Sequence, residues 1–294
     1  MSDTAASLRH KIASAGDLES VVRTMKAIAA SSIGQYENAV RSLDDYYRTV
    51  QLGLSACLRQ AEPARAATRV VQKDTGGIGA VVFGSDQGLV GQFNDVMLDY
   101  ALQTLEHLPG KKIVWAVGER IHARLAETDL QSGESFILPN SISAITPLVG
   151  QILMALEKQR ESGTITQVYL FHHRPKSGAI YIPVHQRLLP LDDLWRQALA
   201  AIPWPTANLP EVMNHGERTL LALVREYLFV SLFRACAESL ASENASRLAA
   251  MQRAEKNIDE LLDDLTRTFQ RLRQSAIDEE LFDVVSGFEA LAGP

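Results

Sequence analysis

Apolar residues recur every seven positions at both ends of the chain, in stretches that contain no proline. The N-terminal stretch runs through Leu8, Ala15, Val22, Ala29, Tyr36, Leu43, Val50 and Cys57, with Ile12, Leu18, Met25, Ile33, Val40, Tyr47 and Leu54 between them. The C-terminal stretch runs through Leu220, Leu223, Tyr227, Val230, Phe233, Ala237, Leu240 and Ala241, and continues through Met251, Ile258, Leu261, Leu265, Phe269, Leu272 and Ala276. A sustained seven-residue repeat is typical of helices that pair as a coiled coil. We therefore predict one long helix within residues 1–62 and a second within residues 211–294.

The two predicted helices are natural partners for each other. A helix of this length needs a surface to cover its apolar stripe, because intrinsic propensity alone does not stabilise it. If a domain between them joins them at one end, they run antiparallel. The C-terminal helix is longer by about 30 Å, so it should overhang from about Phe269 to Leu291. Apolar side chains in this overhang, which include Leu281, Phe282, Val284, Val285 and Phe288, need cover from another protein.

The middle of the chain, residues 63–210, alternates between strand and helix patterns. Strands are expected at residues 78–83, 111–117, 167–172 and 180–189, and helices at 93–108, 119–126 and 145–160. This order, which leaves room for one further strand between the second and third helices, predicts a doubly wound, Rossmann-like α/β globular domain with parallel strand pairing. The predicted fold class is therefore α/β, with a long antiparallel coiled coil of the terminal helices. Residues 190–210 are expected to form a linker in which Trp195 and Trp204 pack against the base of the domain.

Candidate chemistry in the middle of the chain is weak. The turn from Gly84 to Gly91 is rich in glycine, but it matches neither the dinucleotide fingerprint nor the phosphate-binding loop. His172, His173 and His185 have no further ligand at metal spacing, so we interpret them as the polar rim of a hairpin. No nucleophile with a base can be proposed. We expect no cofactor, no metal and no catalytic residue.

Composition and charge narrow the class of partner. The net charge is −6, which gives no global support for binding nucleic acid. No run of about 18 apolar residues exists, so no direct insertion into a membrane is expected. From the pattern alone, a structural coiled coil of unknown use remains open: a tether or interaction protein with an α/β head domain.

Three stretches resemble the gamma subunit of F-type ATP synthases. The first is Met25-Lys26-Ala27-Ile28-Ala29-Ala30-Ser31, and the second is Ser85-Asp86-Gln87-Gly88-Leu89-Val90-Gly91 with Asn94. The third is the C-terminal run that contains Glu243, Ala245, Arg247, Ala250-Met251, Ala254, Asn257, Leu265, Arg273-Gln274, Ala276-Ile277, Glu280-Leu281, Val284-Val285-Ser286-Gly287 and Glu289-Ala290-Leu291. Together these stretches span the chain in order, although residues 110–210 match the family in layout only.

The resemblance implies that the chain is the central rotor shaft of an ion-translocating ATP synthase. Its coiled coil would sit inside a hexamer of alternating alpha and beta subunits, and its globular domain on the ring of membrane c subunits beside the epsilon subunit. Proton or sodium flow would turn the ring, while ATP is made or hydrolysed on the beta subunits. The chain would then be no enzyme by itself. It would be a peripheral protein at the cytoplasmic face of a bacterial plasma membrane.

The resemblance also implies where the surrounding subunits make contact. Contacts are expected at Met25, Lys26, Arg247, Arg273 and Gln274, where arginine suits forked pairing with a carboxylate. The acidic group Asp278, Glu279 and Glu280 is the expected place where the catalytic subunits hold the shaft.

Some positions depart from the family. Gln87, Val90, Ser32 and Asp278 stand where it usually has arginine, cysteine, lysine and threonine, and Gln92-Phe93 replaces a usual Gly-Leu pair. These departures indicate a divergent branch, such as an alternative bacterial ATPase. They leave open the coupling ion and the dominant direction of the reaction.

Overall fold

The computed structural model contains two long helices, a five-stranded sheet and several shorter helices. It describes residues 4–65, 76–176, 178–191, 193–208, 210–212 and 217–291. In chain order the elements are α1 (Ala5–Arg65), β1 (Gly77–Phe83), α2 (Phe93–Glu106), β2 (Lys112–Val117), α3 (Glu119–Leu125), β3 (Gln131–Ser132), the 3₁₀ turn η1 (Ile142–Ala144), α4 (Ile145–Glu161), β4 (Ile165–Lys176), β5 (Ala179–Leu189), α5 (Asp193–Ala200) and α6 (Glu217–Leu291). Across the described residues, none of the helices is both long and apolar enough to cross a bilayer.

The chain divides into two compact units, and α1 and α6 contribute to both. One unit joins Met1–Ala29 to Leu248–Pro294, and the other is Ala30–Arg247. In the first unit, Lys26 pairs with Glu255, and the guanidinium of Arg9 lies 5.4 Å from the ring centre of Phe269. Positions that rise along α1 therefore meet positions that fall along α6, so the predicted antiparallel pairing is confirmed.

The first apolar set predicted on α1 is the buried one. Leu8, Ala15, Val22, Ala29, Tyr36, Val50 and Cys57 are all buried, and Leu43 is half-buried. Three positions predicted in the stripes are wrong, because Leu18, Leu261 and Ala276 are exposed. On α6 the neighbouring Leu262 packs instead, against the cluster of Val22, Met251 and Ile258. Positions three and four residues after Ile258 both lie on the same side of the helix as Ile258. Here the residue four positions on, Leu262, is the one that packs.

The middle of the chain folds into a single mixed sheet with the strand order β3-β2-β1-β4-β5. Strands β3, β2, β1 and β4 pair in parallel, and β5 closes the edge antiparallel to β4. Strand β1 pairs with β2 on one side and with β4 on the other, as a doubly wound sheet requires. The predicted Rossmann-like arrangement is confirmed, with an antiparallel strand added at one edge.

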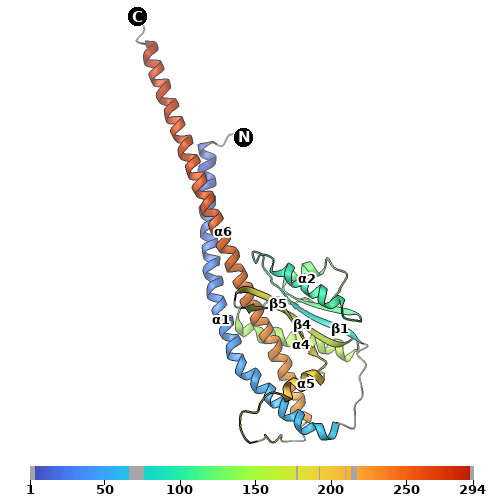
Figure 1. Cartoon of the computed structure of the whole chain (residues 1–294). Coiled ribbons are helices and arrows are strands. Elements are labelled where there is room, and N and C mark those ends of the chain that lie inside the picture. Colours follow the sequence, from blue (N-terminus) through green and yellow to red (C-terminus); the bar gives the residue numbers. More distant parts are fainter. Residues whose placement is uncertain are drawn as a thin grey trace. The chain divides into compact units, whose positions relative to one another are not determined.

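Helices cover both faces of this sheet, and each face has its own core. On one face, α4 and α6 pack on a cluster that includes Val81, Trp115 and Leu170. On the other face, α2 and α3 pack on a cluster that includes Val82, Met97 and Phe171. Figure 1 shows α2 and α4 on opposite sides of the strands. Because β1 is buried on both faces, its sequence is an unbroken apolar run and does not alternate.

The proline-rich stretch 190–210 contains a helix, α5, that the sequence pattern did not predict. Trp195 on this helix meets the ring of Tyr227 edge to face, with 5.2 Å between the ring centres. Trp204 is half-buried, and its indole N–H donates to the hydroxyl of Thr206. Trp195 therefore packs against the first turns of α6, whereas the indole hydrogen bond of Trp204 is local.

Candidate functional site

The C-terminal end of α6 carries an exposed apolar surface. Every residue from 273 to 288 is exposed, and Phe282 and Phe288 expose 72% and 73% of their surface. Ile277, Leu281, Val284 and Val285 are exposed beside them. Figure 1 shows this end of α6 extending past the N-terminal end of α1. The predicted overhang is present, and its side chains have the composition of a surface that another protein covers.

Five of the predicted contact residues lie on this overhang. Arg273, Gln274, Asp278, Glu279 and Glu280 are exposed there, so their side chains are accessible to a partner. Arginine presents its donors in a fixed fork that matches a carboxylate. The overhang therefore combines an apolar surface with charged groups of both signs.

Met25 and Lys26 are engaged within the first compact unit. Met25 is half-buried and packs on the cluster of Val22 and Met251. The ammonium of Lys26 donates to Glu255 on α6, which also lies 3.7 Å from Arg23. These two residues thus help to pair the helices, and only part of each side chain is left to face a partner.

Arg247 is mostly buried. Its side chain is 13% exposed, and Nη2 donates to Oε1 of Glu243 at 2.6 Å, one turn back on α6. Nη1 donates to the amide oxygen of Asn244. Burial raises the pKa of Glu243 above its usual range, and the charge of Arg247 opposes that rise. Glu243 and Arg247 therefore form an internal pair inside α6.

The glycine-rich turn after β1 docks against α6. The hydroxyl of Ser246 donates to the carbonyl oxygen of Val90 at 2.7 Å. Asn94, at the start of α2, accepts a hydrogen bond from the backbone N–H of Ser85 and donates to its hydroxyl. Leu89 adopts a positive φ of 63°. The side chains of Ser85 and Asn94 thus join the turn to the start of α2, which gives both motif residues a structural role.

His172 and His173 are buried, so their interpretation as a polar hairpin rim is wrong. His172 Nε2 lies 2.8 Å from Oε2 of Glu238, and His173 Nε2 lies 2.9 Å from the carbonyl oxygen of Phe93. Strand β4 is covered on both faces, so the alternation along it places both histidines inside. His185 on the edge strand β5 is exposed, and its Nδ1 lies 2.7 Å from the hydroxyl of Tyr100.

Sequence reasoning missed the network of charged side chains around His172, at whose centre the carboxylate of Glu238 is buried. Glu238 and Arg234 on α6 and Asp44 on α1 join His172 and Arg174 in one network. These residues come from three elements far apart in the chain, so no spacing could reveal them. The one available signal was a glutamate and an arginine within the apolar run of α6, four residues apart.

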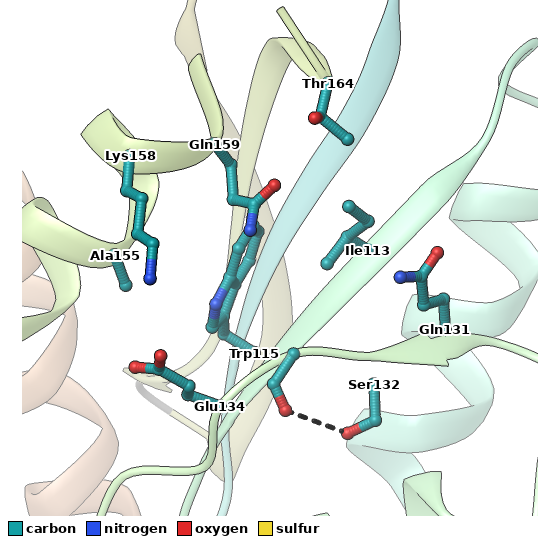
Figure 2. Close-up of a pocket in the computed structure, with 10 residues that line it drawn as sticks. Ile113, Trp115, Gln131, Ser132, Glu134, Ala155, Lys158, Gln159 and Thr164 are labelled. Carbon is teal, nitrogen blue, oxygen red and sulfur yellow. Dashed lines mark hydrogen bonds between the residues drawn. The ribbon is translucent and has the colours of Figure 1, made fainter. Parts of the chain in front are cut away.

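One cavity of about 240 Å³ opens beside the short strand β3. Its lining residues are Ile113, Trp115, Gln131, Ser132, Gly133, Glu134, Ala155, Lys158, Gln159 and Thr164. Figure 2 shows the indole of Trp115 along its wall, with Lys158 and Gln159 coming from α4. The lining holds one carboxylate and one ammonium. Within the described part of the chain, no group of three histidine, cysteine or carboxylate side chains could hold a metal ion.

Comparison with known proteins finds ATP synthase sequences that match this chain over nearly its whole length. The sequence model of the ATP synthase family matches residues 4–291. The ATP synthase gamma chain of Polynucleobacter necessarius is 28% identical, over 97% of this chain and 98% of the relative. That of Moorella thermoacetica is 27% identical over the same shares. Both relatives align from end to end, across the helices and the sheet alike.

Solved structures share the fold. A chain of the Euglena gracilis mitochondrial ATP synthase, in its OSCP/F1/c-ring structure, superposes with a TM-score of 0.65 at 15% identity, over 98% of this chain and 94% of that one. A chain from the central stalk and c-ring of the Tetrahymena thermophila enzyme superposes with a TM-score of 0.57 at 21% identity, over 80% and 99%. The chain belongs to the ATP synthase family, among its gamma chains.

Proposed function

We propose that this chain is the central rotor shaft, the gamma subunit, of an F-type ion-translocating ATP synthase. It couples proton or sodium flow through a membrane sector to ATP synthesis or hydrolysis on the catalytic beta subunits, and it is not itself catalytic. The observation that carries this proposal is the family match over residues 4–291, together with two long antiparallel helices of which one ends in an exposed apolar surface. A coiled-coil tether would not need an exposed apolar surface at the end of its helix.

The partners follow from this role. Alpha and beta subunits surround the paired helices, and the epsilon subunit and c-ring contact the globular domain. The chain lies at the cytoplasmic face of a bacterial plasma membrane as a peripheral subunit. For this role we divide it into residues 1–62 and 211–294, which form the shaft, and residues 63–210, which form the head.

The contact surface that we propose has two parts. Arg273, Gln274, Asp278, Glu279 and Glu280 are exposed on the overhang, which supports direct contact with the surrounding subunits. Met25, Lys26 and Arg247 are partly or mostly buried in the chain. These three residues would contact the subunits through the part of each side chain that stays exposed. Alternatively, they would act indirectly, by holding the helices in the shape that the subunits contact.

Copurification tests the proposal. A tagged chain expressed in its own host should recover alpha and beta ATPase subunits in stoichiometric yield, and the recovered complex should hydrolyse ATP. A deletion of residues 273–294 should reduce that recovery, because it removes the exposed end of α6. Recovery of the tagged chain without ATPase subunits would favour the alternative, a structural tether or interaction protein with an α/β head.

A further inference from the structure

Glu238 is a buried carboxylate on α6 that receives three donors. Its side chain is 4% exposed. His172 Nε2 and Arg174 Nε lie 2.8 and 2.9 Å from Oε2, and Arg234 Nε lies 2.8 Å from Oε1. His172 and Arg174 both belong to β4, while Arg234 lies one turn back on α6. Each oxygen of Glu238 is therefore satisfied, and one of them joins the sheet to the helix.

The network continues from α6 to α1. Arg234 Nη1 lies 3.0 Å from Oδ1 of Asp44, and the guanidinium lies 5.7 Å from the ring centre of Tyr47. Arg234 thus bridges the carboxylates of Glu238 and Asp44. Its planar fork can hold two acceptors at once, which a lysine cannot do in the same geometry. Three elements, β4, α6 and α1, are connected through one chain of ion pairs.

The charges in this network balance without a charge on His172. Two carboxylates, Glu238 and Asp44, face two guanidiniums, Arg174 and Arg234. Nδ1 of His172 is buried and has no hydrogen-bond partner among the described residues, so a second proton there would find no acceptor. Burial lowers the pKa of His172 below its usual value, against the pull of Glu238. Neutral His172 therefore donates Nε2–H to Glu238. Near neutral pH the network keeps this one protonation state.

The surrounding packing makes such a link useful. On this part of α6 the residues packed in the core against the sheet are the small Ala235, Cys236, Ala237 and Ala241, together with Leu232 and Leu240. Apolar contact is non-directional, so it does not by itself specify the direction of any bond between α6 and the sheet. Charge-assisted hydrogen bonds have fixed lengths and directions. The network around Glu238 supplies the directional constraint that the apolar residues lack.

We infer that Glu238 is a positioning residue for torque transfer: it fixes β4 of the head to α6 and, through Arg234, fixes α6 to α1. This inference rests on the proposed rotor function. In a rotor, the head and the shaft helices must turn together, and elastic slip at this junction would let ATP be hydrolysed without a matching ion movement. Glu238 contacts no reacting atom and acts only through the elements it joins.

The test is the Glu238→Gln variant in the complete, membrane-reconstituted ATPase. Glutamine keeps the shape but removes the charge that holds two guanidiniums and a histidine. The expected result is normal assembly and ATP hydrolysis, with severalfold less ion pumped per ATP hydrolysed. The matched control is Glu157→Gln, which makes the same change at an exposed position of α4. It should pump like the wild type. A wild-type ratio of pumping to hydrolysis in Glu238→Gln would overturn the inference.

Two milder variants cover the case in which Glu238→Gln does not assemble. Arg174→Gln removes one donor whose side chain is 47% exposed, and Arg234→Lys keeps the charge but cannot bridge Glu238 and Asp44. Each should lower the pumping ratio, and unchanged ratios in both would reject the inference. If the wild-type complex itself neither assembles nor pumps, the proposed rotor function fails instead. In the isolated chain, amide exchange in β4 should still be faster in Glu238→Gln than in Glu157→Gln.

Discussion

Asp86 is a motif residue whose side chain serves the fold. Its two carboxylate oxygens accept hydrogen bonds from the backbone N–H groups of Glu119 and Leu138, both at 2.9 Å. Glu119 begins α3, where the first backbone N–H groups lack partners inside the helix. One side chain in the turn after β1 therefore fixes both the start of α3 and the segment that follows β3.

Replacing Asp86 by alanine should destabilise the isolated chain. Two backbone donors would lose a charged acceptor, so we expect the free energy of unfolding to fall by about 2–3 kcal/mol. Urea denaturation followed by circular dichroism measures this loss. Asp99→Ala, at an exposed position of α2, is the matched control and should change the free energy by less than about 0.5 kcal/mol. Equal losses in the two variants would contradict the assignment.

The buried histidines of β4 make stability depend on pH. Burial lowers the pKa of His173 to about 4. Below a pH of about 6.5 the unfolded chain takes up a proton that the folded chain refuses. The free energy of unfolding therefore has its full value, as far as His173 is concerned, above that pH. It decreases as the pH falls towards 4. For His173 the full loss is about 3 kcal/mol, and His172, whose pKa is also lowered, adds to it in the same direction.

The measurement is the urea midpoint of the isolated chain between pH 7 and pH 5. We expect the midpoint to fall over this range in the wild type and to fall less in His173→Gln, which has no proton to take up. His10→Gln replaces an exposed histidine on α1 and should keep the wild-type slope. The interval stops above the range in which Glu238 responds, since hydrogen bonds from His172, Arg234 and Arg174 outweigh burial and lower its pKa to about 2. A midpoint that is constant over this range would contradict the prediction.

At the scale of elements, periodicity predicted what local sequence encodes. The seven-residue repeat located both long helices, and the apolar run Ile78–Phe83 located the central strand. The sequence allowed for a strand at the place of β3 but gave it no bounds, because β3 has only two residues and is held by its pairing with β2, which a local pattern does not contain. Helix α5 was missed because prolines surround it, although none lies inside it.

The contacts between distant parts of the chain could be predicted far less well than the elements. His172 and His173 look like a polar edge because their burial depends on helices that cover β4 from elsewhere in the chain. The pairing of Glu238 with Arg174 spans 64 positions, and that of Arg234 with Asp44 spans 190. Such contacts are set by the fold, not by spacing. The overhang, in contrast, could be predicted because it follows from the lengths of two helices.

The register of α6 against α1 gives a prediction at this scale. Ile258 is buried in the first compact unit and Leu261, three residues further on, is 50% exposed. Ile258→Ala should therefore lower the local stability of this unit by about 2 kcal/mol or more, whereas Leu261→Ala should cost less than about 0.5 kcal/mol. Amide exchange of residues 250–262 in the isolated chain measures both. The reverse order would mean that the alternative register is correct.

At the scale of the whole molecule, exposed charge on the overhang should matter only in the assembled complex. Arg273 is exposed and pairing with a carboxylate of a surrounding subunit is its proposed role. Arg273→Glu should uncouple or inactivate the assembled ATPase while leaving the helical circular dichroism of the free chain unchanged. Arg271→Glu, also exposed but rotated by about 200° around the helix, is the control. Normal coupled activity in Arg273→Glu would show that Arg273 does not make this contact.

The overhang as a whole should act as a bearing inside the surrounding subunits. Its exposed surface is built from Leu281, Phe282, Val284, Val285 and Phe288. An apolar surface can turn with few fixed hydrogen bonds to break, since apolar contact is non-directional. Gly287, where an added Cβ would meet nothing within 4 Å, gives the helix backbone more conformational freedom at this point. Asp278, Glu279 and Glu280 are the charged exception and offer a fixed point of contact.

Graded truncation of reconstituted complexes tests this role. Removing only Gly293 and Pro294 should be tolerated, because the apolar surface stays in place and the paired helices still transmit torque. Removing the chain from Asp278 onward should reduce assembly first and torque second, because α6 loses both its charged contact and its apolar support. Rotation and ATP-driven ion pumping are the readouts, normalised to the amount of assembled complex. Loss of assembly on removing two residues, or full function after removal of everything beyond Phe269, would show that this end is not a bearing.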